Sequence, residues 1–168
     1  MKPKSLVGKI LKSLPEILAG IALFTIVFME TAQTIYRYTL SHTFLFVDDV
    51  AVVCFSWAIF AGSAAAYREK MHYGLDVLVN AVPAKHKSKY MVVLDLLITL
   101  VFAYFLYYSF VLFKNAGPKI LMTTGISYRW IDGALLYGFL MMLIYSIEFL
   151  IEDINKMRSG KKEQEEVK

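Results

Sequence analysis

The sequence is poor in the residues that redox, metal and covalent chemistry need. It has one cysteine, Cys54, and three histidines, His42, His72 and His86, among 168 residues. A single thiol excludes an intramolecular disulfide and thiol–disulfide exchange between paired cysteines. All three histidines lie outside the long apolar stretches, which excludes haem ligation between two membrane helices. No zinc spacing, P-loop or Ser-His-Asp arrangement is present, so we expect no cofactor in this chain and no enzymatic activity.

Charged residues are also scarce. They make up 19% of the chain against 58% hydrophobic residues, and the mean hydropathy is +0.53. Soluble domains are about half apolar, so this composition indicates an integral membrane protein with a single domain. The net charge of +4 is small, and the basic residues gather at the ends of apolar stretches. That placement fits membrane orientation and gives no reason to expect nucleic-acid binding.

Four apolar stretches are long enough to cross a hydrocarbon core of about 30 Å, which takes roughly 20 helical residues. We therefore expect an all-α integral membrane fold with four transmembrane helices, at about 17–36, 50–67, 90–113 and 131–151. The first reads as an uncleaved span, because no small-x-small cleavage site follows it. The loop from Lys114 to Trp130 contains Gly117-Pro118 and Gly125 and should be irregular. The charged tail, about 154–168, is expected to fray.

The lysines and arginines predict the orientation. The N-terminal segment, the loop from Arg68 to Lys89 and the tail hold 14 of the 18 basic residues. These three segments lie on one side of a four-span topology. By the positive-inside rule, both termini should be cytoplasmic.

The loop between the second and third spans predicts a short fifth helix at about 72–82. Leu75, Leu78, Val79 and Val82 have the i, i+3, i+4, i+7 spacing of one apolar helix face, and Pro83 ends the pattern. The segment is too short to span a membrane and is flanked by basic residues. We expect an amphipathic helix at the cytoplasmic interface; a soluble helix packed on the spans is the alternative.

Small residues recur on one face of the second span. They are Cys54, Ala58, Gly62 and Ala66, with Ala61 and Ala65 beside them. Small side chains at this spacing let the backbone of a neighbouring helix approach closely. The pattern predicts a packing face, for a helix of this chain or of a partner.

Two acidic residues inside the spans leave more than one interpretation open. Glu30 lies in the outer half of the first span, with Arg37 seven residues later; it is either a coupling carboxylate in a proton path or, as we favour, a structural partner of Arg37 or of the second span. Asp95 lies in the inner third of the third span, near Thr99. It either belongs to an ion site or, as we favour, pairs with a basic residue such as Arg68.

Three further acids, Asp48, Asp49 and Asp132, precede the expected starts of the second and fourth spans. Acids there interact favourably with the positive end of the helix dipole. We expect capping and no further function from them.

The order of these features resembles the small, Q-type membrane subunit of tripartite ATP-independent periplasmic (TRAP) transporters. The first span has an acid and ends near an arginine, and the second contains a tryptophan and a glycine. The second span ends in a basic residue, which is followed by a histidine, an aspartate and a proline. In this order the matching residues are Glu30, Arg37, Trp57, Gly62, Arg68, His72, Asp76 and Pro83. The chain departs from the family at Asp48 and Asp49, because tryptophan and glutamate are more usual at that entrance.

The resemblance implies a scaffold role. Such subunits join a larger, elevator-type membrane subunit that holds the substrate and sodium sites, and a periplasmic binding protein delivers an organic acid, of the C4-dicarboxylate or sialic acid class. It also implies the bacterial inner membrane, with phospholipids around the spans. The residues proposed for structure or subunit packing are Glu30, Arg37, Trp57, Ala58, Gly62, Arg68, His72, Asp76 and Asp95.

A different function class is an autonomous four-helix, proton-coupled transporter that uses Glu30 as its substrate carboxylate. An interfacial helix and a long third loop have no role in such a minimal antiporter. A membrane redox enzyme is a third class, and the lone Cys54 and the loop histidines argue against it.

Overall fold

The chain folds into four long α-helices in a computed structural model that describes residues 6–40, 44–69 and 84–166. They are α1 (Leu6–Leu40), α2 (Leu45–Arg68), α4 (Ala84–Asn115) and α5 (Arg129–Glu166). Each contains a segment long and apolar enough to cross a membrane; the segments are Ser13–Thr39, Leu45–Arg68, Tyr90–Asn115 and Arg129–Asn155. The prediction of an all-α fold with four spans is confirmed. The predicted interfacial helix, 72–82, lies outside the described residues.

The helices are longer than the apolar stretches that predicted them. Between Arg37 and Asp49 the sequence contains neither proline nor glycine, so nothing ends the helices at the hydrocarbon edge. As a result α1 continues to Leu40 and α2 begins at Leu45. The expectation of a frayed tail is wrong, since α5 stays helical to Glu166. Its last turns are rich in lysine, glutamate and glutamine, which are good helix formers.

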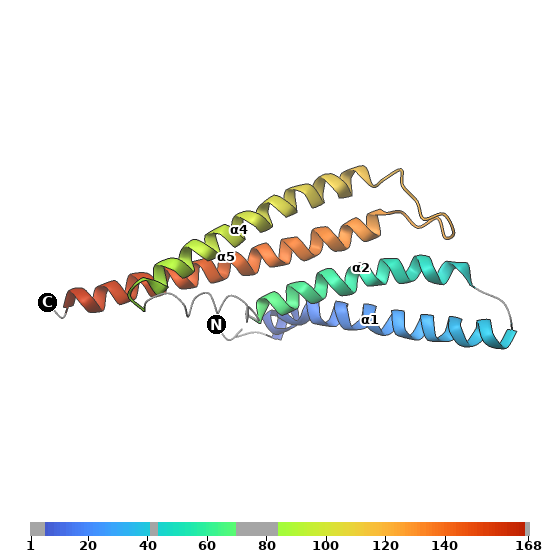
Figure 1. The fold of residues 1–168 in the computed structure, drawn as a ribbon, viewed down its shortest axis with the longest axis horizontal. Coiled ribbons are helices and arrows are strands. Elements are labelled where there is room, and N and C mark those ends of the chain that lie inside the picture. The colour runs from blue at the N-terminus through green and yellow to red at the C-terminus, as the bar shows by residue number, and fades with distance from the viewer. Residues whose placement is uncertain (1–5, 41–43, 70–83, 167–168) are drawn as a thin grey trace.

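The helices lie in a row and do not form a closed bundle. The packed pairs among the four helices are α1 with α2, α2 with α5 and α5 with α4. Two hairpins therefore lie side by side, with α2 and α5 in the middle and α1 and α4 at the edges (Figure 1). Only 6% of the apolar membrane-spanning stretch of α4 is buried within the chain, against 28% of the corresponding stretch of α5. A row of this kind exposes most of its apolar side chains, as a membrane-embedded surface requires.

The core lies where α2 meets α5, toward the Arg68 end of α2. Its buried members are Ala64, Tyr67, Met142 and Tyr145. The Tyr67 ring meets Phe102 of α4 edge-on, with ring centroids 5.0 Å apart, and Phe149 of α5 at 5.7 Å. Aromatic contacts of this geometry add to the area that they bury, so Tyr67 connects three helices in a row whose backbones meet only in neighbouring pairs.

The connection between α4 and α5 is an ordered, irregular loop, as its glycines and proline predicted. The Leu121 N–H donates to the Ile126 carbonyl at 2.8 Å, and the Gly125 N–H donates to the Leu121 carbonyl at 2.9 Å. Gly125 has φ = 72°, a left-handed conformation that glycine adopts without a steric penalty. Ile120 and Ser127 form an isolated antiparallel bridge below this turn.

Candidate helix-packing sites and an interhelical pocket

The small-residue face of α2 packs within the chain. A Cβ added at Gly62 would lie 3.7 Å from the Cβ of Ala19, so this glycine faces α1. The most deeply buried small residues are Ala61 and Ala64, both 0% exposed. They lie beside the predicted face, whereas Cys54 and Ala58 on it are half-buried and Ala66 is exposed. The packing face therefore lies in the predicted part of α2, but the buried residues Ala61 and Ala64 are on a side of the helix next to the predicted one.

A very close approach between α2 and α5 occurs at a glycine that sequence reasoning missed. A Cβ at Gly138 of α5 would lie 2.7 Å from the Cβ of Phe60 and 2.9 Å from its carbonyl oxygen. Both distances are below van der Waals contact, and one partner is backbone of α2. The signal for this site was an isolated glycine inside the fourth apolar stretch.

Trp57 connects the middle of α2 to the start of α5. Its indole N–H donates to the backbone carbonyl of Trp130 at 3.1 Å, and its ring lies 5.7 Å from the ring of Tyr137. The carbonyl of Trp130 is in the first turn of α5. Trp57 therefore has a specific structural partner in addition to the lipid contact that its residue type suggests.

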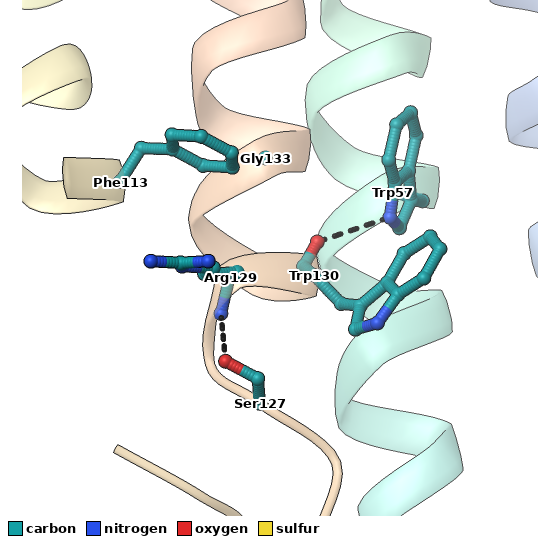
Figure 2. A pocket seen from close by; sticks show the side chains of 6 residues that line it. All are labelled: Trp57, Phe113, Ser127, Arg129, Trp130 and Gly133. Carbon is teal, nitrogen blue, oxygen red and sulfur yellow. Dashed lines mark hydrogen bonds between the residues drawn. The ribbon is translucent and has the colours of Figure 1, made fainter. Parts of the chain in front are cut away.

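A pocket of about 410 Å³ lies across the first turn of α5, beside Trp57. Its lining residues are Trp57, Phe113, Ser127, Arg129, Trp130 and Gly133. Figure 2 shows Phe113 and Arg129 on one side of α5 and the two tryptophans on the other, with Gly133 between them. Most of the lining surface is apolar. The absence of a side chain at Gly133 leaves this space open.

Glu30 and Arg37 are not joined by an ion pair. Glu30 is half-buried on α1, while Arg37 is exposed and its guanidinium lies 5.5 Å from the ring centre of the neighbouring Tyr38. Arg68, at the opposite end of α2, forms ion pairs with Glu16 and Glu69 instead. The expected structural partnership of Glu30 with Arg37 is therefore not formed.

Arg68 connects the first two helices at the opposite end of α2. Its guanidinium forms an ion pair with Glu16 of α1 and lies 3.5 Å from the carboxylate of Glu69. The buried phenol of Tyr145 is within electrostatic range, although it forms no hydrogen bond of normal geometry with a described residue. The pairing of Arg68 with Asp95 that the sequence suggested stays a prediction. Glu16 was missed because it precedes the predicted first span.

Asp95 lies one turn before a polar contact between α4 and α5. The Thr99 hydroxyl donates to the backbone carbonyl of Asp95 at 2.7 Å, and the hydroxyls of Thr99 and Ser146 are 2.7 Å apart. Tyr67 is within electrostatic range of the Asp95 carboxylate. His72 and Asp76, the two remaining candidates, lie outside the described residues.

The acids at the start of α2 connect segments instead of capping the helix. Phe44 precedes the helix and forms no side-chain cap, and Asp48 is in the first turn. Asp48 accepts a 3.3 Å hydrogen bond from the Gln33 amide of α1. Asp49 accepts two bonds of 2.9 Å, from the backbone N–H and the hydroxyl of Thr124. The prediction that both acids only cap α2 is wrong, because Asp49 anchors the loop between α4 and α5.

No group of three or more histidine, cysteine, aspartate or glutamate side chains within residues 6–40, 44–69 and 84–166 could hold a metal ion. In that part of the chain the buried polar side chains are Gln33, Ser109 and Ser146. They lie at different levels of the helices and do not converge on one point.

The comparison with known families decides what kind of protein has this row of helices. The family described as "Tripartite ATP-independent periplasmic transporters, DctQ component" matches residues 19–156. The chain belongs to this family. The match covers the second, third and fourth spans in full and residues 19–39 of the first. The chain is a multi-pass membrane protein of the TRAP transporter family.

Two relatives carry names from the same system. Over 89 residues, or 53% of this chain, it is 28% identical to the C4-dicarboxylate TRAP transporter small permease protein DctQ of Vibrio cholerae serotype O1. Over 140 residues, or 83% of this chain, it is 25% identical to the sialic acid TRAP transporter permease protein SiaT of Haemophilus influenzae. The matched regions span 38% and 23% of the lengths of those two relatives.

Proposed function

We propose that this chain is the small membrane subunit of a TRAP transporter and that it anchors a larger subunit which carries the substrate. The observation that carries the proposal is the DctQ family match over residues 19–156. The DctQ relative is a small permease by name, and the SiaT relative, of which this chain spans only 23%, is named as a permease. A small subunit needs a partner that performs the remaining steps of transport.

The row of helices supports a scaffold role. The buried polar residues Gln33, Ser109 and Ser146 lie on three different helices, α1, α4 and α5, and the helix backbones pack only in neighbouring pairs. A flat row offers two broad faces and two edges, which suits attachment to a larger membrane protein. The moving, substrate-carrying part of an elevator-type transporter would then be in the partner.

The substrate class and the coupling ion follow from the same proposal. The relatives are named for a C4-dicarboxylate and for sialic acid, which are both organic acids. We propose uptake of an organic acid delivered by a periplasmic binding protein and coupled to sodium bound in the large subunit. No observation favours the autonomous proton-coupled transporter that uses Glu30.

The proposed location is the bacterial inner membrane, with both termini cytoplasmic. The N-terminal segment, the segment from Arg68 to Lys89 and the tail hold 14 of the 18 basic residues, which favours the cytoplasm for all three. Labelling of single cysteines in intact cells, in a Cys54→Ser background, tests this orientation. A cysteine at Thr123 should react with an impermeant maleimide and one at Lys162 should not; the reverse pattern would overturn the orientation.

The test of function is reconstitution in liposomes with a sodium gradient. Succinate and sialic acid uptake should require this chain, the large subunit and the binding protein together, and omission of any one should abolish it. Glu30→Gln should reduce uptake only as far as it reduces copurification of the two membrane subunits. Uptake by this chain alone, lost in Glu30→Gln while the fold is intact, would establish the autonomous transporter instead.

A further inference from the structure

The mostly apolar pocket across the first turn of α5 has one positively charged residue, Arg129, in its lining. Arg129 is the first residue of α5, and no acidic side chain in the described part of the chain pairs with its guanidinium. The guanidinium packs over Gly117, where an added Cβ would lie 2.7 Å from Nη2. The backbone N–H of Arg129 donates to the Ser127 hydroxyl at 3.3 Å. The Gly117 contact places the cation beside the pocket, and no described side chain accepts a hydrogen bond from the guanidinium.

The remainder of the pocket is suited to hydrocarbon. Trp57, Trp130 and Phe113 line it, and Gly133 lies between them (Figure 2). Its volume of about 410 Å³ is in the usual range for small-ligand sites. A Cβ at Gly133 would lie 3.6 Å from Cε2 of Phe113, so a larger side chain there would occupy the pocket. The site therefore pairs one fixed cation with an apolar space next to it.

The pocket lies where two spans approach the phospholipid headgroups, at the end of α4 and the start of α5, and Trp57 lines it from the middle of α2. Phe113 is near the end of the Tyr90–Asn115 span, and Arg129 and Trp130 begin the Arg129–Asn155 span. Tryptophan and arginine are both favoured at this interface. A soluble organic acid would match the cation but would gain little from three aromatic side chains. A phospholipid matches both parts, because its phosphate accepts hydrogen bonds from a guanidinium and its acyl chain fills an apolar space.

We propose that this pocket is a binding site for one phospholipid of the leaflet next to the α4–α5 loop. The Arg129 guanidinium binds the phosphate, and the first part of an acyl chain lies over Gly133 between Phe113 and Trp57. A lipid held there fills the space between the end of α4, the start of α5 and the middle of α2. The inference is independent of the transport function proposed above.

The two tryptophans of the chain both line this pocket, so their fluorescence reports its occupancy. The full-length chain in dodecyl maltoside micelles is titrated with phosphatidylglycerol brominated on the upper carbons of its acyl chains, and separately with diacylglycerol carrying the same chains. Bromine quenches tryptophan at short range. The phospholipid should quench in a saturable manner at a mole fraction about tenfold lower than diacylglycerol, because only it has the phosphate.

Matched variants assign the effect to the pocket. Arg129→Gln should remove the tenfold advantage of the phospholipid, and Arg129→Lys should keep part of it. Lys114→Gln, which removes a charge at the same end of α4 but outside the pocket lining, should leave the advantage unchanged. Gly133→Leu should reduce quenching by both lipids. Circular dichroism checks that each variant keeps its helix content.

Three results would overturn the proposal. Equal quenching of the unmodified chain by both lipids would show that the phosphate is not recognised, and this arm needs no variant to fold. A phospholipid advantage that survives in folded Arg129→Gln would place the phosphate elsewhere. Displacement of the brominated phospholipid by millimolar succinate or inorganic phosphate would identify a soluble anion as the ligand.

Discussion

The two contacts that α2 makes, with α1 and with α5, are built differently. Against α1 the helix uses small residues at ordinary separation, with Gly62 and Ala19 as the measured example at 3.7 Å. Polar pairs fasten that contact at both ends: Gln33 with Asp48 at one and Glu16 with Arg68 at the other. Gly62, the glycine of α2 in this contact, would accept a methyl group without overlap.

Against α5 the same helix makes a contact that depends on one residue. Gly138 lies so close to Phe60 that even a methyl group would overlap its backbone, and Trp57 forms its hydrogen bond a short distance away. α1 and α2 are joined by four residues, whereas 60 residues separate α2 from α5. A short connection keeps two helices together at small entropic cost, and a long one does not. The contact between the hairpins therefore needs the closer fit.

Gly138→Ala should have the largest effect, because its new Cβ would lie 2.7 Å from the Cβ and 2.9 Å from the carbonyl oxygen of Phe60. Overpacking of this kind costs about 1–3 kcal/mol, and a backbone partner cannot move aside cheaply, so we expect a loss of about 3 kcal/mol. The free energy of unfolding is measured by titration with sodium dodecyl sulfate in mixed micelles.

Gly133→Ala is the control for this variant, because it makes the same chemical change five residues earlier on α5. Its Cβ would meet only the Phe113 ring, at 3.6 Å, and we expect a change of less than about 0.5 kcal/mol. Similar losses in both variants would mean that any substitution of a glycine in α5 destabilises the protein and that the close approach to Phe60 is not the cause.

The difference between the two contacts also marks what the sequence could predict. Four spans follow from apolar length, and the small-residue face of α2 follows from helical spacing, because both are local patterns. Gly138 is isolated, and its importance depends on which residue of α2 faces it. The same limit applies to Asp49 with Thr124 and to Glu16 with Arg68, whose partners lie 75 and 52 residues away. Local patterns predict helices and faces; they do not predict the register between distant helices.

Asp49→Ala should have the next largest effect, on the side of α2 that meets α5. It removes the acceptor of two 2.9 Å hydrogen bonds from Thr124 and so releases the α4–α5 loop. Hydrogen bonds to a charged group contribute about 1.5–3 kcal/mol when buried; this site is only partly buried, and we expect a loss of about 1.5 kcal/mol. Asp49→Asn keeps an acceptor and should recover about half of it. Proteolysis of the loop at Lys119 should become faster in Asp49→Ala, and an unchanged rate would contradict the anchoring role.

Glu16→Gln should weaken the α1–α2 contact by a smaller amount. Glu16 is 44% exposed and Arg68 17% exposed in their side chains, so water screens the pair, and exposed pairs contribute up to about 1 kcal/mol. The loss should decrease when the salt concentration rises from 0.05 to about 0.5 M, because mobile ions screen exposed charges. Glu69→Gln, which removes a second acid 3.5 Å from the same guanidinium, is the matched control and should cost less. Equal losses in the two variants would show that the ion pair of Arg68 with Glu16 does not stabilise the α1–α2 contact more than the pair with the adjacent Glu69 does.

Gly62→Ala should have the smallest effect, and its sign should be opposite to that of Gly138→Ala. The new methyl group would lie 3.7 Å from Ala19, an ordinary contact that requires no movement of α1. Alanine is favoured over glycine inside a helix by about 0.5–1 kcal/mol, so the variant should be more stable by about 0.5 kcal/mol. A leucine at Gly62 does not fit the same space, so Gly62→Leu should separate α1 from α2. Cysteines placed at Ala19 and Ser63, in a Cys54→Ser background, should then form a disulfide in lower yield. A destabilised Gly62→Ala would show that the α1–α2 contact is as demanding as the α2–α5 contact, and the contrast between a tolerant contact within a hairpin and a strict one between hairpins would be wrong.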